Sequence, residues 1–132
     1  MRRITLPALA FLLSLTSIPC VGAEHTKDSL ETVKKNLDAR KAVLVDVREQ
    51  IEWDDGHVRG AVLLPLSKLK SDLDPKELAK TMPKDKVIYA HCASGRRCLS
   101  AADILKKQGY DVRPLKQGFK DLIEAGFPKA DK

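Results

Sequence analysis

The chain of 132 residues carries 24 lysines and arginines against 18 acids, a formal charge of +6, and is long enough for one domain but not for two. Its lysines are scattered and aromatic residues make up only 5%, so it has neither the basic stripe nor the stacking surface typical of nucleic-acid binding. We expect one small, mildly basic domain that favours small anions as ligands and binds no nucleic acid.

The first 23 residues have the form of a secretory signal peptide. Two arginines precede an apolar run over 4–18, and small residues end the segment before Glu24. The run is short for a membrane span and contains a proline and several hydroxyl residues, which argues against an anchor. A proline just before Cys20 argues against lipid attachment there. We expect removal of 1–23, and a mature domain, 24–132, that is periplasmic or secreted, carries a charge of +4 and has no membrane contact.

Helical and strand patterns alternate through the rest of the chain. The patterns predict helices over 26–40, 49–54, 67–72, 75–80, 98–108 and 119–125, and strands over 42–47, 62–64, 87–91 and 111–115. This alternation predicts a single α/β domain with a mostly parallel sheet and helices on both faces. A proline in the last strand places that strand at an edge. Ligands of such sheets bind at the carboxyl ends of the strands.

A tight loop joins the third predicted strand to the helix that follows it. Cys92 is its first residue, Gly95 its fourth and Arg97 its sixth. Backbone N–H groups and the helix dipole converge at such a place, so it favours anions and favours a thiolate over a thiol. Because the thiolate is the nucleophilic form, the loop predicts an active site with Cys92 as nucleophile.

Cysteine counting points in another direction. If Cys20 leaves with the signal, Cys92 and Cys98 remain in an oxidising compartment. Two cysteines in an exported domain more often form a structural disulfide than an active site. Counting alone therefore favours a disulfide, whereas the loop around Cys92 favours catalysis.

Several polar residues lie near the same predicted sheet edge. Asp46 stands inside an apolar strand, which is costly unless the carboxylate is paired, so we interpret Asp46 and Arg48 as a structural ion pair rather than catalytic groups. His57 lies between glycine-containing turns without a second ligand at metal spacing, which favours a loop-fixing hydrogen bond over a general base or metal ligand. No metal site or cofactor is expected. His91 precedes Cys92 in the strand and should point to the opposite face.

Taken together, these motifs resemble the rhodanese family. The first half of the domain is represented by Val45-Asp46-Val47-Arg48, Glu52-Trp53, Gly56-His57-Val58-Arg59-Gly60-Ala61 and Pro65. The active-site loop is represented by Cys92-Ala93-Ser94-Gly95-Arg96-Arg97. The C-terminal part is represented by Gly109-Tyr110-Asp111-Val112, Gly118-Phe119 and Ala125-Gly126-Phe127-Pro128. The resemblance covers about 26–128 and is nearest to small single-domain exported bacterial rhodaneses.

The resemblance implies a thiosulfate sulfurtransferase. Cys92 would accept a sulfane sulfur as a persulfide and pass it to cyanide or a thiol. The substrate-binding residues would be those of the loop, Ala93, Ser94, Gly95, Arg96 and Arg97, whose N–H groups cradle the sulfur and the anionic donor. Arg97 would orient the loop or the donor, and Arg96 would face the mouth and attract the anion. Asp46, Arg48 and His57 would be scaffold.

One departure from the family pattern leaves alternatives open. Cys98 stands where the family commonly has a serine or another small residue. It is either a resolving thiol that attacks the Cys92 persulfide or closes a disulfide, or a bystander packed on its helix. The first case allows a redox-switched thiol-disulfide module instead of a transferase. A Cys-based phosphatase or arsenate reductase is disfavoured, because those loops need five residues between Cys and Arg, and here only four separate Cys92 from Arg97.

Overall fold

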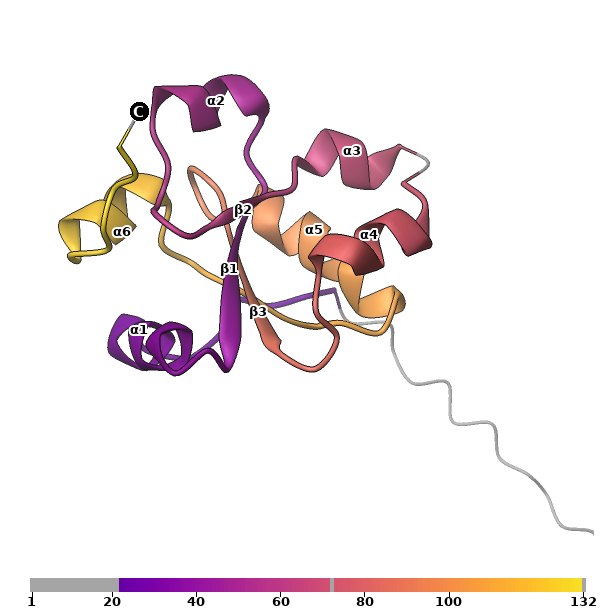
Figure 1. The fold of residues 1–132 in the computed structure, drawn as a ribbon, viewed down its shortest axis with the longest axis horizontal. Coiled ribbons are helices and arrows are strands. Elements are labelled where there is room, and N and C mark those ends of the chain that lie inside the picture. Colours follow the sequence, from indigo (N-terminus) through magenta and orange to yellow (C-terminus); the bar gives the residue numbers. More distant parts are fainter. Residues whose placement is uncertain (1–21, 72, 132) are drawn as a thin grey trace, which may run out of the picture.

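A four-stranded parallel sheet runs through the middle of the protein (Figure 1) in the computed structural model, which describes residues 22–71 and 73–131. The strands β1 (Ala42–Asp46), β2 (Val62–Leu63), β3 (Val87–His91) and β4 (Asp111–Pro114) lie in the order β2-β1-β3-β4, and every pair is parallel. The helices are α1 (Leu30–Asp38), α2 (Gln50–Asp55), α3 (Leu66–Lys70), α4 (Pro75–Thr81), α5 (Arg97–Lys107) and α6 (Phe119–Glu124). The predicted α/β class, the parallel sheet and the edge position of β4 are confirmed.

Helices cover both faces of this sheet, as predicted. In Figure 1, α1 and α6 lie to one side of the strands, and α3, α4 and α5 lie to the other. Two buried clusters correspond to these layers, one built around Val33, Tyr89 and Leu122 and one that joins the sheet to α3, α4 and α5. Because β1 and β3 are covered on both faces, their sequences are apolar almost throughout.

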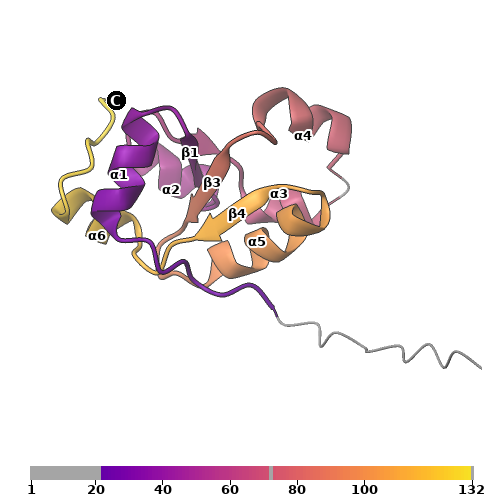
Figure 2. The ribbon, with the colours of Figure 1, turned by 90° about the horizontal axis from the view of Figure 1, so that it is seen from below.

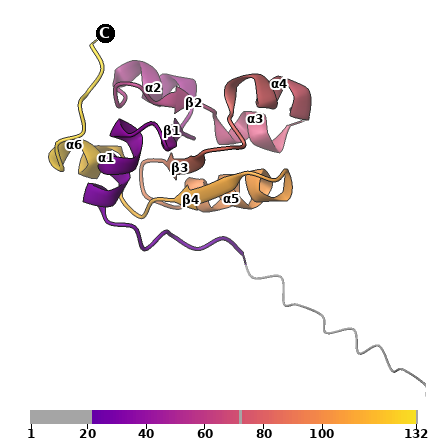
Figure 3. The same cartoon turned by 60° about the horizontal axis from the view of Figure 1, so that its bottom comes forward.

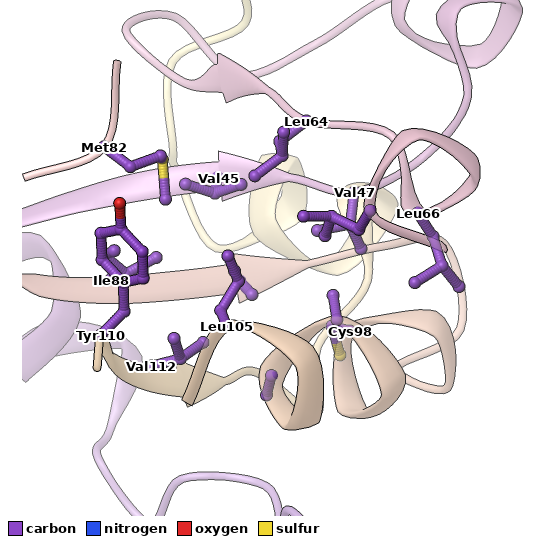
Figure 4. Close-up of a cluster of buried hydrophobic side chains, with 14 of the residues drawn as sticks. Val45, Val47, Leu64, Leu66, Met82, Ile88, Cys98, Leu105, Tyr110 and Val112 are labelled. Carbon is purple, nitrogen blue, oxygen red and sulfur yellow. The ribbon is translucent and has the colours of Figure 1, made fainter. Parts of the chain in front are cut away.

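The larger cluster reaches the end of the sheet where the cysteines lie. Figure 4 shows Val45 of β1 and Val47, which follows the strand, on the side of the sheet that faces α5, with Cys98 near Val47 and Leu66. Cys92 belongs to this cluster as well, and neither cysteine has exposed surface. The two thiols are therefore shielded from bulk water.

The predicted helix over 26–40 is wrong at its start, because α1 begins only at Leu30. Ser29 is the N-cap and its hydroxyl accepts the N–H of Thr32. The residues before it are held in other ways: the N–H of Thr26 bonds to the carbonyl of Pro114, and the carboxylate of Asp28 accepts the Tyr89 hydroxyl. The other predicted elements agree with the structure to within one or two residues, and the last residue of the predicted 67–72 helix lies outside the described part.

The segment before α1, residues 22–29, runs past α5 and β4 (Figures 2 and 3). The N–H of Ala23 donates to Asp103 on α5 at 2.7 Å, and the Thr26 N–H donates to Pro114 at 2.8 Å. We call this segment the N-terminal strap. The predicted signal peptide and Cys20 lie almost entirely outside the described residues, so the signal stays a prediction. Over 22–71 and 73–131, no helix is both long and apolar enough to cross a bilayer.

Candidate active site

The loop between β3 and α5 folds back on the sulfur of its first residue. β3 ends at His91 and α5 begins at Arg97, so the chain reverses within five residues. Gly95 has φ 82°, a left-handed conformation, and its N–H donates to Cys92 Sγ at 3.1 Å. The loop residues Ala93, Ser94 and Arg96 are exposed, whereas Cys92 and Gly95 are buried. The thiol thus lies under the loop, at the N-terminal end of α5.

Two glycines let this loop pack against the chain that follows β4. A Cβ on Gly95 would lie 2.7 Å from the carbonyl oxygen of Lys116, and a Cβ on Gly118 would lie 1.8 Å from that of Ala93. The N–H of Phe119 also donates to the Cys92 carbonyl at 2.9 Å. The cysteine loop therefore packs directly against the 116–119 segment. Neither position admits a larger residue without displacement of backbone.

The pKa of Cys92 is lowered from 9.0 to about 5. The largest cause is a hydrogen bond from the Cys98 thiol, and the backbone N–H groups of Cys98, Ser94 and Gly95 lower the pKa further, while burial opposes them. These donors all stabilise the thiolate. Near neutral pH Cys92 is therefore ionised and needs no separate general base.

This pKa leads to a testable pH dependence. Only the thiolate reacts with iodoacetamide, so the alkylation rate of Cys92 should rise as pH increases through about 5 and be flat above about pH 6. An ordinary cysteine would instead show its midpoint near about 8.5. The measurement is the second-order rate constant from pH 4 to 9, with the labelled residue identified by peptide mass. A midpoint above about 7 would contradict the lowered pKa, since no thiolate-stabilising environment would then be present.

Cys98 and Cys92 are free thiols, so the structural disulfide that cysteine counting favours is not formed. Gly95 donates its N–H to Cys92, and the Cys98 thiol also lies within hydrogen-bond distance of the Gly95 carbonyl at 3.2 Å and the Leu115 carbonyl at 3.3 Å. The pKa of Cys98 is strongly raised, first by its hydrogen bond to Cys92 and then by burial. Cys98 therefore stays a thiol at neutral pH and acts as a donor.

Arg97 is held by a residue outside the loop. Its guanidinium makes two hydrogen bonds of 2.7 Å to the carboxylate of Glu52 on α2, a bidentate pair that also lowers the pKa of Glu52 to about 2. Arg97 thus ties α2 to the end of the loop and is not free to reach outward in this conformation. The neighbouring Arg96 is exposed.

Beneath the loop lies a buried ion pair. Arg48 donates to Asp46 through its backbone N–H, Nε and Nη2, at 2.7 to 3.1 Å, and its Nη2 also reaches the carbonyl of Gly56. The guanidinium stacks over Phe119 at 4.3 Å. His91 Nε2 is 3.7 Å from the Asp46 carboxylate, and burial lowers the pKa of His91, which favours its neutral form. Asp46, Arg48 and His91 thus form a buried polar cluster at the carboxyl ends of β1 and β3.

His57 fixes its own turn. Its Nδ1 lies 3.1 Å from the carbonyl of Trp53, and its ring stacks on the indole at 3.6 Å with an angle of 6° between the planes. Arg48 bonds to the adjacent Gly56, so this turn is joined to the buried ion pair. His57, Arg48 and Asp46 therefore lie in one supporting unit, and no hydrogen bond from His57 to the cysteine loop is present in the described structure.

Sequence reasoning brought the loop residues together but missed some of their partners. Glu52 and Gly118 stand out in the sequence only as parts of family motifs, and no motif contains His25, whose imidazole contacts the loop. The sequence contains one local indication that Glu52 has a structural role: it lies three residues after Glu49 and completes the capping box of α2. The contact of His25 joins residues 70 positions apart and leaves no local pattern.

Comparison with known proteins agrees with this fold. The family model for the rhodanese-like domain matches residues 29–125. The chain is 40% identical over 82 residues to protein YqhL of Bacillus subtilis, covering 61% of this chain and 60% of that protein. It is 39% identical over 101 residues to the Mycobacterium tuberculosis protein named "Probable adenylyltransferase/sulfurtransferase MoeZ", covering 74% of this chain but 25% of MoeZ. The human single-domain sulfurtransferase TSTD1 superposes with a TM-score of 0.65 at 27% identity, over 78% of this chain and 97% of that one.

The chain therefore belongs to the family of rhodanese-like domains, as its motifs predicted. Its relatives include proteins named as sulfurtransferases, which supports a transferase. The chain spans about 60% of the length of the Bacillus relative and a quarter of MoeZ.

Proposed function

We propose that this domain is a thiosulfate-type sulfurtransferase that carries a sulfane sulfur on Cys92. The observation that supports this most strongly is the loop itself: a thiolate with a pKa near 5, held under backbone N–H groups at the start of α5. Such a site stabilises a negatively charged sulfur before and after transfer. The identity of the donor and acceptor classes rests on this chemistry and on the family resemblance.

The reaction runs in two displacements. The Cys92 thiolate attacks the outer sulfur of thiosulfate, the S–S bond of the donor breaks, and sulfite leaves with the electron pair, so that Cys92 holds a persulfide. Cyanide or a thiolate then attacks the outer sulfur of the persulfide and releases thiocyanate or a new persulfide, which regenerates the Cys92 thiolate. Each step breaks one sulfur–sulfur bond and forms one sulfur–sulfur or sulfur–carbon bond, so no external oxidant is needed.

The other loop residues attract the donor, surround the transferred sulfur and orient the loop. Arg96 is exposed at the mouth and attracts the dianionic donor, while the N–H groups from Ala93 to Arg97 surround the transferred sulfur. Arg97, held by Glu52, orients the loop. Because Cys92 has no exposed surface, the exposed part of the loop must shift outward to admit the donor.

Intact mass of the purified protein after brief thiosulfate treatment without reductant tests the proposal. We expect a gain of one sulfur atom, lost again when cyanide is added. The parallel variant Cys98→Ser keeps a hydroxyl donor in place of the thiol and should gain the same sulfur. A loss of two hydrogen atoms by the wild type, with no sulfur gained, would instead mean a Cys92–Cys98 disulfide and a redox-switched module. The raised pKa of Cys98 argues against that outcome, because a protonated thiol is a poor attacking group.

A further inference from the structure

His25, on the N-terminal strap, contacts the cysteine loop directly. Its Nε2 lies 2.6 Å from the carbonyl oxygen of Gly95, and the two residues are 70 positions apart. A carbonyl oxygen can only accept, so the imidazole donates through Nε2, which carries a proton in the imidazolium and in one neutral tautomer. We propose that His25 is a positioning residue for the Cys92 thiolate and its persulfide, an inference that rests on the proposed role of Cys92 as nucleophile.

The contact acts through Gly95. This residue presents its N–H to Cys92 Sγ at 3.1 Å on one side and its carbonyl to His25 on the other. Since its φ of 82° is available mainly to glycine, the chain here has little intrinsic preference for this conformation. A donor on the carbonyl fixes the orientation of the residue and so keeps the N–H directed at the sulfur.

The same contact affects Cys98. Cys98 has one thiol proton and can give it to the Gly95 carbonyl, to the Leu115 carbonyl or to the Cys92 thiolate, which is the largest cause of the low Cys92 pKa. When His25 donates to the Gly95 carbonyl, that oxygen competes less for the Cys98 proton. His25 thus supports both the backbone donor and the thiol donor on the Cys92 sulfur.

The strap is built to hold His25 in place. The next residue along the strap, Thr26, donates its N–H to the carbonyl of Pro114 at 2.8 Å, a bond that remains when residues 1–23 are removed. Asp28 accepts hydrogen bonds from Tyr89 at 2.6 Å and Arg113 at 2.9 Å. These bonds to β3 and β4 hold the strap along the sheet edge, so the fold itself places the imidazole of His25 against the loop.

Alkylation of Cys92 by iodoacetamide across pH 4 to 9 tests the inference. His25→Ala removes the donor, and loss of a hydrogen bond of ordinary strength should raise the midpoint by about half a unit to one unit. At pH 5 this is a fall in rate of about two- to fivefold, from the smaller thiolate fraction. His25→Gln places an amide N–H near the same point and should keep the wild-type midpoint. Lys27→Ala, an exposed neighbour on the strap, is the matched control and should change nothing.

Each other result overturns the inference. If the pH midpoint of Cys92 alkylation were unchanged in His25→Ala, even with a faster rate at high pH, His25 would only shield the loop from solvent and would not be a positioning residue. An equal shift in His25→Gln would show that the packing or charge of the imidazole, rather than its hydrogen bond to Gly95, matters. Should the alanine variant fail to fold, His25→Asn, whose shorter amide does not reach the carbonyl, takes its place. Alkylation needs no sulfur donor, so these results stand apart from the success or failure of sulfur transfer.

Discussion

Cys92→Ser should lower the rate of sulfur transfer from thiosulfate to cyanide by at least about a thousandfold, because it removes the atom that forms the persulfide. A serine hydroxyl ionises far above neutral pH and forms no persulfide, so the N–H groups of the loop have no sulfur to stabilise. The measurement is steady-state formation of thiocyanate, with kcat and KM determined separately. The loss should be in kcat, since the donor-attracting Arg96 is left in place.

Cys98→Ser is the matched control for this prediction. It replaces the second buried thiol of the same cluster and should retain transfer, with higher activity than the wild type where oxidation would otherwise join the two cysteines. Full activity in Cys92→Ser would place the nucleophile elsewhere. Loss of activity in both variants would indicate that the pair, and not Cys92 alone, performs the reaction.

Asp46→Ala should reduce the free energy of unfolding by about 3–5 kcal/mol, because it leaves the buried guanidinium of Arg48 without its counter-ion. Asp46 has no exposed surface and Arg48 is 5% exposed, so water cannot replace the lost carboxylate. Urea unfolding at pH 7, followed by far-UV circular dichroism, gives the midpoint and slope needed. A denatured Asp46→Ala variant would agree with a loss at the upper end of this range.

Two variants control for this measurement. Glu77→Ala breaks the exposed pair with Lys80, whose side chains are 60% and 67% exposed, and should cost no more than about 1 kcal/mol. The double variant Asp46→Leu with Arg48→Met removes both charges and should regain most of the stability lost in Asp46→Ala. If Asp46→Ala were no more destabilising than Glu77→Ala, the pair beneath the loop would not support the sheet edge.

Much of the fold could be read from local sequence. The apolar runs that became β1 and β3 are short and nearly free of polar residues, which is the signature of parallel strands covered on both faces. The proline in β4 placed it correctly at the edge of the sheet. The predicted first helix begins too early because the strap over 26–29 has helix-compatible residues, whereas its bonds to Pro114, Tyr89 and Arg113 hold it outside the helix.

The local sequence was enough to predict the chemistry of the site, because a thiol at a strand end, a glycine three residues later and a helix start beyond it are the pattern of an anion site. The tertiary structure decided how that site is held. The bonds of Glu52 to Arg97, of His25 to Gly95, and the close packing of Gly118 on Ala93 join segments distant along the chain. Such contacts depend on how strands and loops are placed in space, and no local periodicity encodes them. The environment of Cys98 was decided in the same way, because its thiol donates to the carbonyl of Leu115, which follows β4.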